Sequence, residues 1–148
     1  ERLLLEWRND PFVQKYSFSQ RKVNYEAHHA WFVGRLNDSK NCKIFIAETR
    51  TEGLPIGQVR FSQINDVWEV HFSLSKIGRG HKLAFSMIEV AIKEFSLCPT
   101  EASLIARVKF ENKASQRVFE RLKFAKSVGP GYILYLTKVG KAGYENNY

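Results

Sequence analysis

The segment Ser73-Leu74-Ser75-Lys76-Ile77-Gly78-Arg79-Gly80-His81-Lys82-Leu83-Ala84 decides the fold, because the period of the hydrophobic residues changes within it. Apolar and polar residues alternate from Val67 to Leu74, which predicts a strand. Beyond the glycines, apolar residues recur at helical spacing and predict a long helix, at Leu83, Met87, Ala91 and Phe95. The glycines allow a sharp turn, in which backbone amides and the helix dipole can hold a phosphate-bearing ligand.

The rest of the chain predicts short helices and strands around this junction. Residues 3–9 are expected to form a helix that ends before Pro11, followed by a loop rich in serine and basic residues. Asn24 and Asn112 can each cap a further helix. Alternation predicts strands at residues 43–47, 56–62, 67–74, 103–110, 124–128 and 132–138. We therefore expect a single domain over residues 1–148, with residues 139–148 as a flexible tail.

The composition indicates one globular domain with excess positive charge. The chain has 148 residues, 44% of them hydrophobic and 14% aromatic, which suffices for one core. Its longest apolar run, Tyr132 to Leu136, is far shorter than the ~20 residues of a membrane span. Two widely separated cysteines, Cys42 and Cys98, predict buried thiols in a reducing cytoplasm. We thus expect a cytoplasmic protein without a membrane partner.

The net charge of +8 favours an anionic partner. The basic residues lie singly or in pairs, without the clustered tract of a nucleic-acid arm, so we expect no nucleic-acid partner. Nucleic-acid binding is kept as an alternative that rests on the charge alone.

Two kinds of chemistry lack the residue patterns that they require. His28 and His29 are adjacent on a predicted helix and point about 100° apart, with no further ligand at metal-binding spacing, so we expect no metal. The chain has no Gly-x-Ser-x-Gly sequence and no Cys/His nucleophile arrangement, so hydrolase chemistry is unsupported.

The segment from Ser73 to Ala84 resembles motif A of the GNAT N-acetyltransferases, Arg/Gln-x-x-Gly-x-Gly/Ala, which holds the pyrophosphate of acetyl-CoA. The segment from Asn112 to Phe124 resembles the Asn-x-x-Ser/Ala helix of the same family. The resemblance implies the α/β GNAT fold, with a mixed, mostly antiparallel sheet, helices on both faces, and central strands splayed to admit acetyl-CoA. The cofactor-binding residues that it implies are Leu74, Arg79, Gly80, His81, Lys82, Leu83, Ala84, Asn112, Ser115 and Phe119.

Two further segments, Leu4 to Pro11 and Ile56 to Phe61, resemble the GNAT enzymes and fused domains of pseudaminic-acid-type pathways. This resemblance implies an amine acceptor on a nucleotide-linked deoxyamino sugar, and a fusion to or association with an upstream sugar-nucleotide enzyme. Trp7, Arg8 and Arg60 are the expected acceptor-binding residues; Trp7 is equally suited to anchor the first helix. A protein or peptide N-terminus is the alternative acceptor, since a Trp-Arg-Asn-Asp segment also occurs in GNATs that acetylate ribosomal proteins.

The chain departs from the family pattern at several positions. Lys82 and Lys123 stand where the family has glycine, and Phe119 where many members have a tyrosine that protonates the departing thiolate. Lys82 either supplies a cation or weakens cofactor binding. A degenerate GNAT domain that binds CoA or docks another enzyme is therefore kept as a third alternative.

The resemblance implies direct attack of the amine on the acetyl thioester, without an acyl-enzyme intermediate. A bulge near Ser73 would turn the Leu74 N–H toward the oxyanion. Glu69 is the expected general base, with a pKa raised by burial, or else a salt-bridged or solvated strand residue. His71 lies on the same strand face and is a further catalytic candidate or a satisfied sheet histidine. Tyr132 and Tyr135 are substitute acids or, equally, packing residues.

Overall fold

The computed structural model describes residues 1–97 and 101–140. Three helices come first, α1 (Arg2–Asn9), α2 (Pro11–Tyr16) and α3 (Tyr25–Asn37). Three strands follow, β1 (Cys42–Glu48), β2 (Pro55–Ile64) and β3 (Val67–Leu74). The remaining elements alternate, as α4 (Leu83–Ser96), β4 (Ala102–Val108), α5 (Lys113–Arg121), β5 (Ala125–Gly129) and β6 (Tyr132–Val139).

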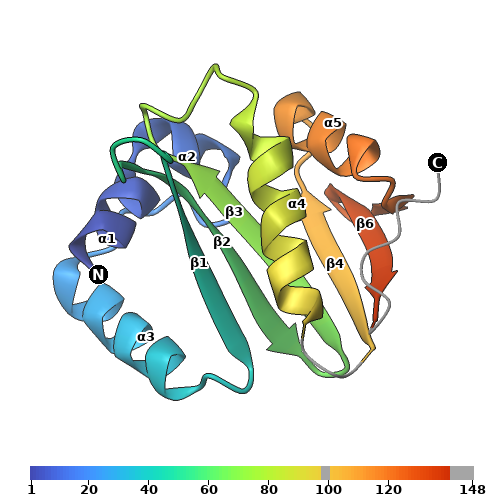
Figure 1. The fold of residues 1–148 in the computed structure, drawn as a ribbon, viewed down its shortest axis with the longest axis horizontal. Coiled ribbons are helices and arrows are strands. Elements are labelled where there is room, and N and C mark those ends of the chain that lie inside the picture. Colours follow the sequence, from blue (N-terminus) through green and yellow to red (C-terminus); the bar gives the residue numbers. More distant parts are fainter. Residues whose placement is uncertain (98–100, 141–148) are drawn as a thin grey trace.

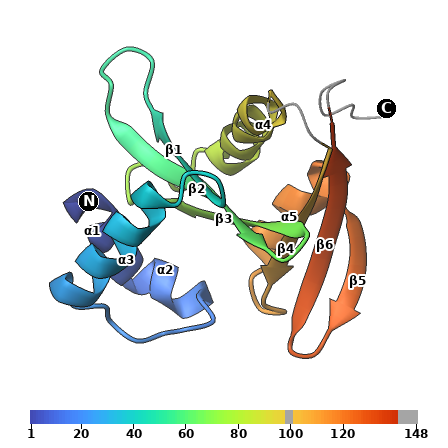
Figure 2. The same ribbon diagram turned by 90° about the horizontal axis from the view of Figure 1, so that it is seen from below.

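The described strands form one six-stranded sheet in the order β1-β2-β3-β4-β6-β5. Among the described strands, only β3 and β4 pair in parallel, and every other pair of adjacent strands is antiparallel. The helices α1–α3 lie against one face of the sheet, and α4 lies against the other (Figures 1 and 2). This is the predicted mixed α/β sheet with helices on both faces.

The two central strands separate soon after they meet. β3 and β4 pair only at Val67 with Ser103, Trp68 with Leu104 and Glu69 with Ile105, although both strands continue. Figure 2 shows the two halves of the sheet diverging from this short contact. The expected splay between the central strands is therefore present.

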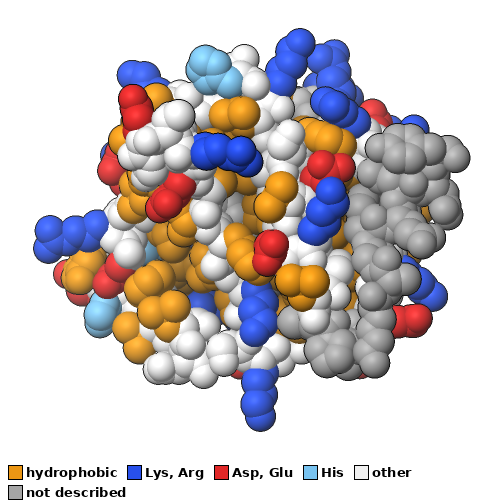
Figure 3. Space-filling model, viewed as in Figure 1, with side chains coloured by type: hydrophobic (Ala, Val, Ile, Leu, Met, Phe, Trp, Pro, Cys, Tyr) orange, Lys and Arg blue, Asp and Glu red, His pale blue; other side chains and the backbone are white. Residues whose placement is uncertain are grey.

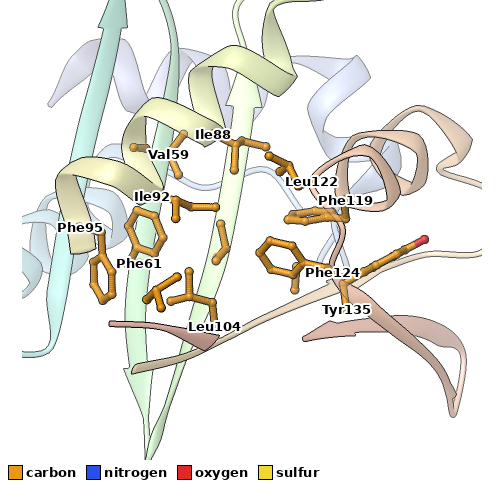
Figure 4. Close-up of a cluster of buried hydrophobic side chains, with 14 of the residues drawn as sticks. Val59, Phe61, Ile88, Ile92, Phe95, Leu104, Phe119, Leu122, Phe124 and Tyr135 are labelled. Atoms are coloured by element: carbon orange, nitrogen blue, oxygen red, sulfur yellow. The ribbon is translucent and has the colours of Figure 1, made fainter. Parts of the chain in front are cut away.

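The hydrophobic core fills the space between the sheet and the helices α4 and α5. Phe61 stacks on Phe95 with ring centroids 4.5 Å apart, and Phe119 stacks on Tyr135 at 5.4 Å. Figure 4 shows these aromatic rings with Ile88, Ile92 and Leu104 between them. Burial of several large side chains, each contributing about 1.5–3 kcal/mol, holds the diverging strands in one domain.

Two expectations about the helices and strands are wrong. Pro11–Tyr16 is the helix α2 and not a loop, because the Asp10 side chain accepts hydrogen bonds from the Phe12 and Val13 amides and Pro11 suits a first helical position. Val139 belongs to β6 and pairs with Ala102, so the chain is still in the sheet at residue 139. Residues 141–148 of the predicted tail lie outside the described residues.

The structure bears on the expected buried thiols and on the expected lack of a membrane span. Cys42 is buried and free, and Cys98 lies outside the described residues. In the described part of the chain, no helix has the length and apolarity needed to cross a membrane.

Candidate active site

The backbone of β3 offers hydrogen-bond donors where β4 has moved away. The Ser75 amide donates to the Ile56 carbonyl of β2 at 2.9 Å, so the amides of alternate residues before it face β2 as well. The amides of Leu74 and Phe72 therefore face the opposite side, toward the splay. The β2–β3 register is unbroken from Ile64 and Val67 to Gly57 and Leu74, so the expected bulge is wrong. Separation of the strands, and not a bulge, directs the Leu74 N–H into the opening.

The loop after β3 is held against the end of the sheet. The Ser75 hydroxyl and carbonyl accept hydrogen bonds from the Gly78 amide at 3.2 and 3.1 Å. A side chain at Gly78 would collide with the Ile56 carbonyl oxygen, which explains the glycine there. Gly80 adopts φ +82°, the left-handed conformation that glycine tolerates best.

The start of α4 leaves backbone donors without a side-chain cap. Lys82 is the N-cap residue, adopts φ 58° and makes no capping hydrogen bond. The amides that follow, beginning with Leu83 and Ala84, can therefore donate to an anion. His81 and Lys82 are exposed at the same end of the helix. These features suit the phosphate-binding role predicted for this loop.

Arg79 is oriented differently from the other predicted cofactor residues. Its guanidinium donates two hydrogen bonds to the Asp10 carboxylate, each 2.9 Å long, and lies 4.7 Å from the centroid of the Phe12 ring. The hydrogen bonds from Arg79 lower the pKa of Asp10 to about 2. The Arg79 side chain thus contacts the helices on the other face of the sheet.

The predicted residues of α5 have structural roles. Asn112 caps the helix by accepting a hydrogen bond from the Ser115 amide at 3.1 Å. Phe119 is 1% exposed and lies edge-on to Phe72 of β3, with centroids 5.9 Å apart. The sequence reasoning missed Gln116, which is buried and donates to the carbonyls of the preceding loop. The helix is thereby fixed beside the opening.

An ion pair spans the two central strands on the face that α1–α3 cover. Arg107 of β4 donates to the Glu69 carboxylate of β3 at 2.6 and 2.8 Å, and His71 Nε2 lies 3.3 Å from Glu69 Oε2. Burial raises the pKa of Glu69, but the hydrogen bonds from His71 and Arg107 outweigh it and lower this pKa to about 2. The expected raised pKa of Glu69 is therefore wrong, because Arg107 lies opposite the carboxylate and stabilises its charged form.

His71 is better suited than Glu69 to accept a proton near neutral pH. Burial lowers the pKa of His71 below its ordinary 6.5, and the hydrogen bond with Glu69 offsets this only in part. The ring is therefore neutral near pH 7. Nε2 is the ring nitrogen that faces Glu69, and in the neutral tautomer with its proton on Nε2, Nδ1 is a proton acceptor.

Four buried polar atoms without a hydrogen-bond partner in the described residues lie in β2 and α1. They are Gln58 Oε1, Arg60 Nε and Ser62 Oγ of β2, and Arg8 Nη1 of α1. Residues 58, 60 and 62 alternate along β2 and so share one face, on which Arg60 pairs in register with His71. Arg60 lies 5.1 Å from the Trp31 ring of α3. Buried polar groups normally have partners, so this cluster indicates a place for a polar ligand.

The predicted acceptor residues divide into two groups. Burial lowers the pKa of Arg60, and the charges of Arg35 and Arg8 act in the same direction. Arg8 also donates through Nη2 to the Ser19 carbonyl at 2.8 Å. Trp7 is 5% exposed, as its alternative role in anchoring the first helix requires. Arg8 and Arg60 thus lie together, whereas Trp7 packs.

Tyr135 and Tyr132 differ in their surroundings. The Tyr135 hydroxyl donates to Glu120 at 3.3 Å and points out of the core cluster (Figure 4). Burial raises the pKa of Tyr135 to about 12, which makes it a poor acid. Tyr132 lies 6.1 Å from Phe18 and 6.0 Å from the Arg107 guanidinium, measured from its ring centroid.

The face of the sheet that α4 covers carries a hollow with few polar side chains. A cavity of about 450 Å³ lies between β1, β2 and α4, and its lining is mostly apolar. Figure 3 shows this face, where Lys and Arg side chains are scattered among acidic and hydrophobic ones. No group of three or more potential metal-ligating side chains occurs within the described residues.

The chain matches the family model of the acetyltransferase (GNAT) domain over residues 1–125. It belongs to the GNAT acetyltransferase family. The family, and not the splay alone, identifies the domain as an acyltransferase. No curated protein matches the chain in sequence.

Several solved structures share this GNAT fold. A domain from Methanocaldococcus jannaschii is 23% identical, with a TM-score of 0.79 over 93% of this chain and 91% of its own. Spermidine N-acetyltransferase from Vibrio cholerae, in complex with CoA and spermine, is 15% identical, with a TM-score of 0.78 over 97% and 90%. Ribosomal-protein-alanine N-acetyltransferase from Brucella melitensis is 18% identical, with a TM-score of 0.72 over 93% and 91%. At these identities the likeness concerns the fold.

Proposed function

We propose that this GNAT domain transfers the acetyl group of acetyl-CoA to a primary amine on a nucleotide-linked deoxyamino sugar. The cluster of Arg8, Arg60, Gln58 and Ser62 carries the proposal, because its unpaired donors and acceptors suit a phosphate with neighbouring hydroxyl groups. The cluster lies beside His71, the candidate base.

The described residues offer a suitable group for cofactor binding, for proton transfer and for stabilisation of the oxyanion. Acetyl-CoA supplies the acetyl thioester, and its pyrophosphate suits the amides at the start of α4 and the charges of His81 and Lys82. The amine nitrogen bonds to the acetyl carbon and the carbonyl π electrons move to oxygen, which gives a tetrahedral oxyanion; the carbonyl then re-forms, the carbon–sulfur bond breaks, and CoA leaves as the thiolate. His71 Nδ1 accepts the amine proton, Glu69 orients the ring, and the Leu74 N–H stabilises the oxyanion.

The charge of the site weighs against a polyamine acceptor such as the spermine in the Vibrio cholerae complex. Burial is the main cause of the lowered pKa of Arg60, and the positive charges of Arg35 and Arg8 lower it further. A polycation would add to the repulsion among these charges, whereas a phosphate would relieve it. A peptide N-terminus needs no buried guanidinium and stays the alternative acceptor.

The proposal is tested by calorimetric titration with acetyl-CoA, followed by initial rates with three acceptors: an amino-sugar nucleotide, a peptide and spermidine. We expect micromolar acetyl-CoA binding and the highest kcat/KM with the sugar nucleotide. Arg60→Gln should raise the KM for the sugar nucleotide about tenfold or more, because it removes a charge-assisted contact. Arg50→Gln, in an exposed turn, is the matched control. Preference for the peptide, or an unchanged KM in Arg60→Gln, would contradict the assignment.

Failure to bind acetyl-CoA would contradict the enzymatic proposal as a whole. It would favour a degenerate GNAT domain that docks another protein. An upstream sugar-nucleotide enzyme is the proposed partner, by fusion or association, and co-purification of the two activities would support it.

A further inference from the structure

The ion pair between Asp10 and Arg79 joins two parts of the molecule that the proposed reaction uses separately. Asp10 lies between α1 and α2, on the acceptor side, and Arg79 lies in the loop from β3 to α4, on the cofactor side. Figure 1 shows α2 beside the tip of β3, where this loop begins. The two residues are 69 positions apart in sequence.

Both partners of the pair are held in place by further contacts. Asp10 Oδ1 also accepts hydrogen bonds from the Phe12 and Val13 amides, at 2.8 and 3.3 Å, and so begins α2. The Arg79 amide donates to the Ser75 carbonyl at 3.2 Å, and its guanidinium lies over the Phe12 ring. The side chains are only 23% and 21% exposed. The pair is thus a fixed link and not a transient surface contact.

The ion pair with Asp10 occupies the Arg79 guanidinium, which is therefore not available as a phosphate ligand. Both terminal nitrogens of its guanidinium donate to Asp10, and the planar fork of arginine matches a carboxylate well. The uncapped amides at the start of α4, together with His81 and Lys82, form the anion-binding end of the loop without it.

The ion pair also lies close in sequence to Arg8, one of the proposed acceptor-binding residues. Arg8 is two residues before Asp10, and its Nη1 is one of the unpaired buried atoms. A ligand that further restricts the motion of the loop from Ser75 to Lys82 would therefore also restrict α1 and α2, which contain and support Arg8.

We propose that Arg79 is a positioning residue that, through its ion pair with Asp10, couples acetyl-CoA binding at the loop to acceptor binding beneath α1. The inference rests on the proposed function. Coupling between two binding sites is reciprocal, so the acceptor strengthens acetyl-CoA binding by the same factor.

The test compares Asp10→Asn, Arg79→Gln and the double variant with the wild-type protein. Asparagine caps a helix as well as aspartate does, so Asp10→Asn removes the ion pair while the start of α2 stays intact. Lys76→Gln removes an exposed charge from the same loop and is the matched control. Two quantities are measured: the Kd of acetyl-CoA, and the amide hydrogen exchange of residues 2–16 with and without acetyl-CoA.

We expect acetyl-CoA to slow exchange in residues 2–16 of the wild-type protein and of Lys76→Gln, but not of the two ion-pair variants. Each ion-pair variant should weaken acetyl-CoA binding equally, by about fivefold, and the double variant should weaken it no further. If Arg79 instead contacts phosphate, Asp10→Asn will leave the Kd unchanged or lower it, while Arg79→Gln raises it. That outcome, or unchanged exchange in the wild-type protein, would overturn the inference alone. Absence of acetyl-CoA binding in the wild-type protein would overturn the proposed function together with the inference.

Discussion

Arg107 of β4 holds the carboxylate of Glu69 of β3 through two hydrogen bonds, at the point where the two strands cease to pair. The last β3–β4 pair joins Glu69 and Ile105, and Arg107 is two residues further along β4. The side chain of Glu69 is 5% exposed, and that of Arg107 is 41% exposed. The ion pair therefore replaces backbone pairing where the sheet opens.

Replacement of Arg107 should destabilise the fold. Arg107→Gln leaves a buried carboxylate without its bidentate partner, and we expect a loss of about 1–3 kcal/mol in the free energy of unfolding. Urea denaturation measures the loss, with Arg117→Gln on the exposed side of α5 as the control. Adding Glu69→Gln should recover part of the loss, because the pair is then removed as a whole. Additive effects of the two changes would show that the pair does not act as a unit.

Glu69 should also make stability depend on acidity. Its pKa is about 2 in the folded chain, against 4.5 for the unperturbed group, so the folded state favours the charged form. This contribution is fully present above about pH 5 and is lost as the pH falls toward 2. The urea midpoint of the wild-type protein should therefore fall between pH 5 and pH 3, and Glu69→Gln should reduce that fall. An equal fall in both proteins would assign the acid sensitivity to other groups, with Asp10 as the next candidate.

The comparison of Glu69 with its neighbours shows what periodicity can and cannot predict. Alternation placed Glu69 and His71 on one face of a strand, and the strand has the predicted bounds, Val67–Leu74. The parallel partner of that strand depends on a crossover through α4, which local patterns do not specify. Local patterns therefore do not reveal Arg107, and burial alone predicts the pKa of Glu69 in the wrong direction. The Asp10 cap of α2 is a separate case, because Pro11 is compatible both with the end of one helix and with the start of the next.

The pH profile of kcat/KM should identify the proton acceptor. We expect an acidic limb from His71, at a pH below its ordinary 6.5, because burial and the charges of Arg60 and Arg107 lower the pKa of the ring. His71→Gln should remove this limb and lower kcat/KM about 100-fold or more. Glu69→Gln should move the limb to lower pH, since Glu69 raises the pKa of His71. An acidic limb that persists in His71→Gln would assign the proton transfer to another group.

Lys123 has a backbone conformation that favours glycine. It adopts φ 60° just after α5, where the Phe124 amide donates to the Phe119 carbonyl at 3.1 Å, as in a Schellman motif. Lys123→Gly should stabilise the fold by about 1 kcal/mol and raise the Tm by about 2–4 °C. Lys40 is an exposed turn residue whose φ is not positive, so Lys40→Gly should not raise the Tm. A lower Tm in Lys123→Gly would show that the lysine side chain makes a compensating contact.

Lys82 has the same backbone conformation, with φ 58°, but it lies at the anion-binding end of α4. Lys82→Gly should again raise the Tm, whereas acetyl-CoA binding should weaken about twofold to fivefold, because a cation beside the uncapped amides is lost. Calorimetric titration in low and high salt separates the two effects, since salt screens the charge and should reduce the difference between the proteins. Lys82→Asn is the companion variant, because asparagine tolerates the left-handed conformation without a positive charge. Tighter binding in both variants would show that the lysine side chain obstructs the phosphate, as the departure from the family pattern allows.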